Sequence, residues 1–130
     1  MAAILATALA AGTIAPSAAQ ASIGQCGSGM ACLWQDLNYT GGFVQDSRWL
    51  KMGLVWNNLA TSVASYGNTN CARFWDDTGF TGAYIDFSRP ARGGTYRDPD
   101  LRNGGGYGPH RTENWNDRIG SQNWQKCPRV

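Results

Sequence analysis

Apolar and aromatic runs along this chain are short, and glycine, asparagine and aspartate separate them. Runs of this kind, bounded by turn-forming residues, are typical of antiparallel strands joined by tight turns. After residue 21 we find no helical periodicity of apolar positions. The pattern therefore predicts an all-β chain, with strands at residues 33–35, 43–45, 61–66, 73–75, 83–87 and 121–125.

The pattern also repeats. WQDLNYTG at residues 34–41 matches WDDTGFTG at residues 75–82, with an aromatic residue, a second aromatic and a glycine at equal spacing. A second pair follows, LVWNNLATSV at 54–63 and ENWNDRIGSQ at 113–122, and the later copy carries an insert near residues 89–110. An internal repeat of this kind indicates two copies of one supersecondary unit.

Each copy reads as a strand, a tight glycine corner, a second strand, a long connection and a closing strand. Four antiparallel strands with one long return connection form a Greek key, and two such units form a sandwich. We therefore predict one domain over residues 22–130, with the first motif at about 32–70 and the second at about 71–127. Six tryptophans, five tyrosines and four phenylalanines supply much of its core.

Residues 1–21 are set apart by composition. They form an alanine-rich apolar run that ends in Ala19-Gln20-Ala21, a site suited to signal peptidase. The run is too weakly apolar before Pro16 to predict a membrane span. We expect a signal peptide at 1–21 and a secreted, extracellular mature chain.

The four cysteines fit an exported disulfide framework, for which three pairings are possible. Cys26 and Cys32 flank a short flexible loop that can close on itself, and Cys71 would then pair with Cys127. A metal site is disfavoured, since the chain lacks paired C-x-x-C spacing and has one histidine.

Charge and chemistry exclude several classes of function. A formal net charge of +2, scattered along the chain, does not predict nucleic acid or an anionic membrane as a partner. His110 stands alone in a glycine-rich segment, and the adjacent Asp76 and Asp77 lie in a turn. Without a nucleophile and base at suitable spacing, we do not expect an enzyme.

The corner motif, followed by (N/D)-(N/D)-x-x-(S/T)-S, resembles the paired motif of βγ-crystallin domains. The opening Cys26-Gly-Ser-Gly-Met-Ala-Cys32-Leu-Trp and the later Asn38-Tyr-Thr-Gly resemble secreted bacterial peptidase inhibitors of the same fold, whose type members inhibit metalloproteinases. The resemblance implies a monomeric inhibitor of a secreted protease and points to Cys71–Ala72 as the inhibitory bond. The alternative is that Cys71 only ties a strand to the C-terminus.

The crystallin-like motif also implies a calcium site. One ion would be held by the side chains of Asn58 and Thr61, the carbonyl of Leu59 and a main-chain carbonyl near Thr78. Oxygen ligands suit calcium, but uncharged ones bind it weakly. In the second motif Gly120 stands where Thr61 offers a hydroxyl. Alternatively, these polar groups satisfy only the turn backbone, and no cofactor is required.

The insert and the aromatic side chains leave a third class open. Long loops in compact domains are functional or flexible, and arginine and tyrosine are favoured at interfaces. The insert is thus either a recognition loop or a solvated one, and a cell-envelope or carbohydrate-binding role would use aromatics such as Trp49 or Tyr107. The possible recognition residues are Arg92, Tyr96, Arg97, Arg102 and Tyr107.

Overall fold

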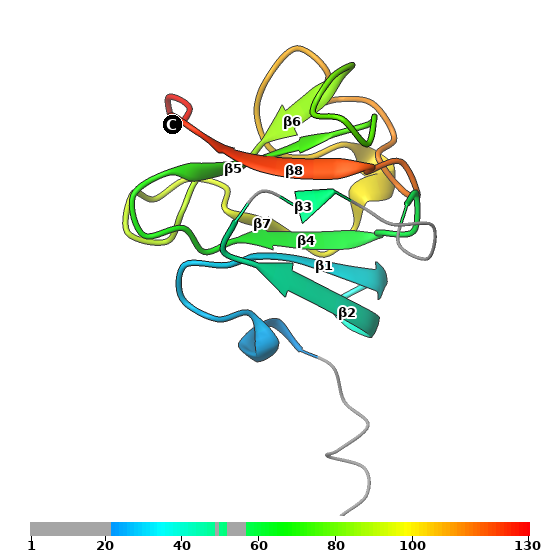
Figure 1. Ribbon diagram of the computed structural model, residues 1–130, viewed down its shortest axis with the longest axis horizontal. Coiled ribbons are helices and arrows are strands. Elements are labelled where there is room, and N and C mark those ends of the chain that lie inside the picture. Colours follow the sequence, from blue (N-terminus) through cyan, green and yellow to red (C-terminus); the bar gives the residue numbers. More distant parts are fainter. Residues whose placement is uncertain (1–21, 49, 52–56) are drawn as a thin grey trace, which may run out of the picture.

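The computed structural model of the protein describes residues 22–48, 50–51 and 57–130; the predicted signal peptide at 1–21 lies outside them. The described chain forms two four-stranded antiparallel sheets that lie one above the other (Figure 1). The first sheet has the order β2 (Thr40–Asp46), β1 (Ala31–Asp36), β4 (Ser62–Ser65) and β7 (Arg97–Asp98). The second has the order β3 (Leu50–Lys51), β8 (Ser121–Gln125), β5 (Cys71–Trp75) and β6 (Tyr84–Asp86).

Helical structure in the described residues is confined to two 3-10 turns, η2 (Ile23–Gln25) and η3 (Leu101–Asn103). All six predicted strands are present with slightly different ends. The predicted all-β class and double Greek-key sandwich are therefore confirmed. Among the described residues, no helix has the length and apolar character needed to cross a membrane.

The two copies exchange their third strands. β3 belongs to the first copy but pairs with β8 of the second, with Leu50 opposite Gln122. β7 comes from the insert and pairs with β4 of the first copy, with Val63 opposite Asp98. The insert is therefore not a solvated loop, because it contributes a strand to the first sheet.

The core lies between the sheets and consists of one cluster of buried side chains, which includes Leu33, Val63, Phe74, Phe87 and Trp115. Leu101 of η3 belongs to the same cluster and is fully buried. The backbone nitrogen of Leu101 donates to the carbonyl of Thr61, and that of Trp115 donates to the carbonyl of Leu101. The insert is thus anchored in the core.

A second apolar cluster lies on the outer face of the first sheet. Trp34 and Cys32 point away from the sandwich core, yet both are fully buried. The N-terminal segment covers them, and in Figure 1 η2 lies on this outer side. This cover explains why β1 is apolar at successive positions, where a strand with one solvated face would alternate.

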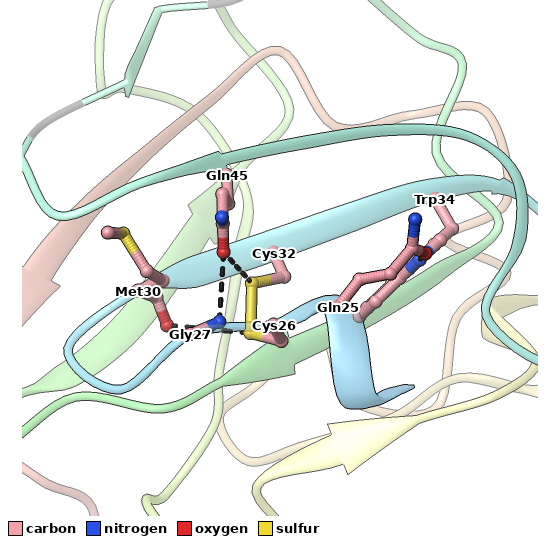
Figure 2. Close-up of a disulfide and its surroundings, with 7 residues drawn as sticks. All are labelled: Gln25, Cys26, Gly27, Met30, Cys32, Trp34 and Gln45. Carbon is pink, nitrogen blue, oxygen red and sulfur yellow. Dashed lines mark hydrogen bonds between the residues drawn. A yellow bond between two sulfur atoms is a disulfide. The ribbon is translucent and has the colours of Figure 1, made fainter. Parts of the chain in front are cut away.

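The Cys26–Cys32 disulfide fixes this cover (Figure 2). Gln25 accepts a hydrogen bond from the indole nitrogen of Trp34 at 2.8 Å. Gln45 of β2 accepts one from the backbone nitrogen of Gly27 at 2.9 Å. The second disulfide joins Cys71 to Cys127, so both predicted pairings are confirmed.

Both glycine corners have the predicted geometry. Gly41 and Gly82 have φ of +79° and +91°, and a β-carbon at either would lie within 2.3 Å of the Asp36 or Asp76 carboxylate. Glycine is therefore required at both positions. In the first corner the ring of Tyr39 packs edge-on against Trp34, with centroids 5.1 Å apart.

Tyr39 sets an alkaline limit on stability. Burial raises the pKa of Tyr39 from 10.0 to about 12, although the neighbouring Arg97 guanidinium opposes the shift. In the unfolded chain the phenol ionises at its ordinary pKa of 10.0. As the pH rises above that value the unfolded state loses this proton first, so stability should fall progressively until the folded phenol also ionises. Absorbance titration of tyrosinate should show a late phase that Tyr39→Phe removes; an unchanged late phase would contradict the assignment.

Candidate functional site

The Cys71–Ala72 bond lies inside the second sheet. Cys71 and Ala72 are 1% and 0% exposed, and β5 has β8 on one side and β6 on the other. The backbone nitrogen of Ala72 donates to the Ser65 hydroxyl at 3.0 Å, and its carbonyl accepts from the backbone nitrogen of Phe87 at 2.9 Å. A peptidase could reach this bond only by unpairing β5. The structure therefore places the predicted inhibitory bond in a buried, paired strand, where Cys71 ties β5 to the C-terminus.

A serine hydroxyl holds the backbone of each glycine corner through two hydrogen bonds. The Ser62 hydroxyl donates to the carbonyl of Asp36 at 2.8 Å and accepts from the backbone nitrogen of Tyr39 at 3.1 Å. Ser121, the matching residue of the second copy, makes the same two contacts with Asp77 and Phe80. The final serine of each repeated motif therefore has a structural role, which the sequence repeat could have indicated.

The first corner borders a pocket of about 510 Å³. Thr61 lines it together with Asn116, which comes from the second copy. The amide oxygen of Asn116 is buried and has no hydrogen-bond partner among the described residues. The pocket is lined by Asp36, Leu37, Asn38, Thr40, Thr61, Arg102 and Asn116.

The four residues predicted to bind calcium do not all line this pocket. Of the four, Thr61 lines the pocket, whereas Asn58, Leu59 and Thr78 are not among its lining residues. Asn58 occupies a left-handed turn position with φ of 62°, and its backbone nitrogen donates to the carbonyl of Ile119. The amide that joins Thr61 is that of Asn116, which sequence analysis did not propose as a ligand.

The second corner holds an arginine. Arg118 donates to Glu113 at 2.8 Å, lies 3.4 Å from Asp76 and stacks on Trp115 at 4.2 Å from the ring centroid. Arg118, and then His110, lower the pKa of Glu113. A permanent cation beside the corner carboxylate removes the charge that would attract a metal ion. This corner therefore does not fit calcium.

The predicted recognition residues of the insert do not act as one group. Tyr96 packs edge-on against Tyr66, and Arg97 lies over the Tyr96 ring.

The other three residues of the set have separate partners. The Tyr107 hydroxyl accepts from the backbone nitrogen of Thr95 at 2.8 Å. Arg92 donates to the carbonyl of Pro128. Arg102 pairs with Asp100, and this pairing lowers the pKa of Asp100.

The remaining candidates carry little functional signal. Trp49, an aromatic suggested for carbohydrate binding, lies outside the described residues. His110 is not isolated as its sequence context suggested, because its Nδ1 lies 2.6 Å from Glu113. Within the described part of the chain, no group of three or more His, Cys, Asp or Glu side chains is placed to hold a metal.

Comparison with known proteins agrees with this fold. A βγ-crystallin from Ciona intestinalis covers 74% of this chain and 99% of its own, with 17% identity and a TM-score of 0.54. A βγ-crystallin from an archaeon has 14% identity and a TM-score of 0.53, covering 74% and 96%. Spherulin 3a from Physarum polycephalum has 18% identity and a TM-score of 0.51, covering 81% and 90%. At these identities the likeness shows the fold alone.

The sequence itself gives a more specific match. Residues 19–73 match peptidase inhibitor family I36, a span that includes the N-terminal disulfide, the first motif and the start of β5. No curated protein matches the chain. A match to an inhibitor family agrees with the expectation that the chain is not an enzyme. The chain therefore has the βγ-crystallin fold, and over residues 19–73 its sequence is similar to peptidase inhibitor family I36.

Proposed function

We propose that the protein is exported, loses residues 1–21 and inhibits secreted metalloproteinases as a monomer. The family match over residues 19–73 carries this proposal, because it assigns inhibition to the part of the chain that resembles the metalloproteinase inhibitors. Two disulfides support it, since disulfides form and persist in oxidising compartments outside the cytosol.

The export step has a direct test. The full chain should be expressed in a secreting bacterial host and recovered from the medium, and its N-terminus should be sequenced. We expect a mature chain that begins near Ser22. A chain retained in the cells, or secreted with residues 1–21 intact, would contradict the proposed leader.

The target class is tested by titration. Purified protein should be added to a panel of secreted metallo-, serine and cysteine peptidases, and residual activity should be followed to near-equimolar ratios. We expect stoichiometric loss of activity with a metalloproteinase and an inhibitor that is intact after incubation. Inhibition confined to serine or cysteine peptidases would contradict the metalloproteinase assignment.

Weak calcium binding at the first corner is a second candidate function. The unpartnered amide oxygen of Asn116 favours it, because a buried oxygen without a donor is a suitable cation ligand. Thr61 and the three residues from Asp36 to Asn38 line the same pocket, and their hydroxyl, carboxylate and amide groups supply oxygen atoms. These oxygens would hold one calcium ion, and the ion would then bridge the two copies. Asp36 and Arg102 also line this pocket, and Arg102 is paired with Asp100. With little net charge nearby, we expect a dissociation constant of roughly 10⁻⁴ to 10⁻³ M.

Thr61→Ala separates calcium binding from turn capping. In the unaltered protein, millimolar calcium should raise the thermal midpoint, because the ion binds only the folded state. Thr61→Ala should abolish that rise while leaving the calcium-free midpoint close to its original value. A midpoint that responds to calcium equally in both proteins would show that Thr61 is not a ligand.

Gly120→Ser is the matched variant at the second corner. It restores a hydroxyl at the position equivalent to Thr61, but its β-carbon would lie 2.8 Å from the carbonyl oxygen of Asp76. We therefore expect a lower midpoint without a second calcium site. Calorimetry that found two equivalent sites in this variant would contradict the role given to Arg118 and to the close approach of the backbone.

A further inference from the structure

Three tyrosine rings and one arginine lie in a row on the outer side of the first sheet. Arg97 of β7 pairs with Ala64 of β4, which belongs to the second apolar cluster, and directly paired residues point to the same side of a sheet. The guanidinium carbon of Arg97 lies 6.0 Å from the centroid of the Tyr39 ring and 5.3 Å from that of Tyr96. The Tyr96 and Tyr66 rings are 5.6 Å apart. We call these four residues the tyrosine row.

The row is held in place by the backbone of the sheet and its corner. The backbone nitrogen of Tyr39 donates to the Ser62 hydroxyl at 3.1 Å. The carbonyl of Tyr96 accepts from the backbone nitrogen of Ser65 at 2.7 Å, and Arg97 itself lies in β7. Because the row is ordered before binding, a ligand that binds it causes little further loss of entropy in the protein.

The positive charge of the row has no carboxylate partner. Arg97 is exposed, and none of the ion pairs among the described residues includes it. Burial raises the pKa of both Tyr39 and Tyr66, and in each case the Arg97 guanidinium opposes the rise, so one charge lies close to two phenols. A planar guanidinium held in this way is suited to a carboxylate, which accepts two parallel hydrogen bonds from it.

The surroundings of Arg97 favour a sugar, and not a protein segment, as the bearer of that carboxylate. Tyrosine rings offer apolar faces to the C–H groups of a sugar ring, and their hydroxyls both donate and accept hydrogen bonds. The centre of a protein interface is instead rich in apolar side chains. Within the described residues, Val130 at the C-terminus is the only exposed large hydrophobic side chain, and it is not part of the row.

We propose that the tyrosine row binds an acidic polysaccharide. Arg97 binds the carboxylate of a uronic-acid unit, and the tyrosine rings pack against that unit and its neighbours along the polymer. The inference goes beyond the inhibition of peptidases and does not depend on it. Such binding would retain an exported protein at a surface that carries carboxylated polymers.

Polygalacturonate, a polymer of one uronic acid, is the probe, and dextran is the neutral polymer for comparison. Calorimetric titration of the purified protein at fixed ionic strength should show binding to polygalacturonate and none to dextran. Absence of binding to polygalacturonate, or equal binding to dextran, would overturn the proposal. Poly-aspartate carries carboxylates without sugar rings, so equally tight binding to it would show that the sugar is not recognised.

Arg97→Gln tests the guanidinium, and Arg48→Gln is the matched control for the change in charge. The Arg48 side chain is 84% exposed and does not belong to the row. We expect Arg97→Gln to raise the dissociation constant for polygalacturonate about tenfold, the scale of a lost hydrogen bond to a charged group. Arg48→Gln should change it less than about twofold, because solvent and salt screen an exposed charge. Equal losses in the two variants would mean that net charge alone attracts the polymer.

Two further variants separate shape from charge. Arg97→Lys keeps the positive charge without the planar fork and should weaken binding about threefold. Tyr96→Leu keeps an apolar side chain without the ring and should weaken binding while leaving its dependence on ionic strength unchanged. Thermal midpoints of all the variants verify that they are folded. If either folded variant binds polygalacturonate as tightly as the unaltered protein, the tyrosine row is not the sugar site.

Discussion

Replacing both Cys71 and Cys127 by alanine should lower the free energy of unfolding by about 4 kcal/mol on the chain-entropy account. The reason is the length of chain that this disulfide closes, 56 residues, which restricts the unfolded state strongly. The same replacement at Cys26 and Cys32, which are 6 residues apart, should cost about 2 kcal/mol. The disulfide that joins β5 to the C-terminus thus contributes more than the one that fixes the N-terminal cover.

Urea unfolding followed by tryptophan fluorescence can measure both losses, with the Cys26/Cys32 variant as the control for removing a disulfide in general. The order of the two losses is the sharper test, since the absolute values depend on residual structure in the unfolded chain. Equal losses, or a larger one for Cys26 and Cys32, would mean that the N-terminal cover stabilises the sandwich more than loop length indicates.

Leu101→Ala should lower the free energy of unfolding by about 2–5 kcal/mol, the range for truncating a buried leucine. Leu101 lies in the insert and is fully buried in the core between the sheets. If the insert were a flexible loop attached to a complete domain, shortening one of its side chains would have almost no effect. A large loss therefore shows that the insert is part of the core.

Arg102→Ala is the control for Leu101→Ala. Arg102 is the next residue in η3, and its side chain is 54% exposed and pairs with Asp100 at the surface. Exposed ion pairs of this kind contribute little to stability, so the variant should unfold almost like the unaltered protein. Thermal melts of both variants suffice, and a similar midpoint for the two would overturn the anchoring role of Leu101.

Local patterns predicted much of this fold. The spacing of Trp34, Tyr39 and Gly41, and its recurrence at Trp75, Phe80 and Gly82, indicated two tight corners, and both are present. The corners were predictable because each is formed by residues close in sequence: a glycine that can adopt a positive φ, and the two strands that it joins. The short loop between Cys26 and Cys32 indicated one disulfide in the same way, and the second followed from it.

Features that depend on distant residues were not predictable. β7 has two residues, Arg97 and Asp98, in a segment rich in glycine and proline, too short to show a strand period. Its partner β4 lies more than thirty positions earlier in the sequence, and only the assembled sheet brings the two together. That Thr61 and Asn116, from the two copies, line one pocket was not predicted for the same reason.

The connection between β4 and β5, residues 67–70, gave an even weaker signal. Gly-Asn-Thr-Asn reads as an ordinary link between two motifs, and it has neither charge nor apolar character. Its rigidity comes from Ser28, Gly29 and Trp124, which belong to other parts of the chain. The sequence instead drew attention to the Cys71–Ala72 bond that follows it, because the resemblance to the inhibitor family includes that cysteine and does not include a polar turn.

The exchange of third strands has a consequence for a chain cut between β4 and β5, within residues 67–70. Such a cut leaves two fragments that no disulfide joins, because Cys26–Cys32 lies entirely in the first and Cys71–Cys127 entirely in the second. The two fragments would nevertheless stay paired, because β3 of the first pairs with β8 of the second and β7 of the second pairs with β4 of the first. Cleavage there would therefore nick the chain without releasing either fragment. Because of the same strand exchange, residues 67–70 are a natural point at which to divide the protein into two pieces that reassemble when mixed.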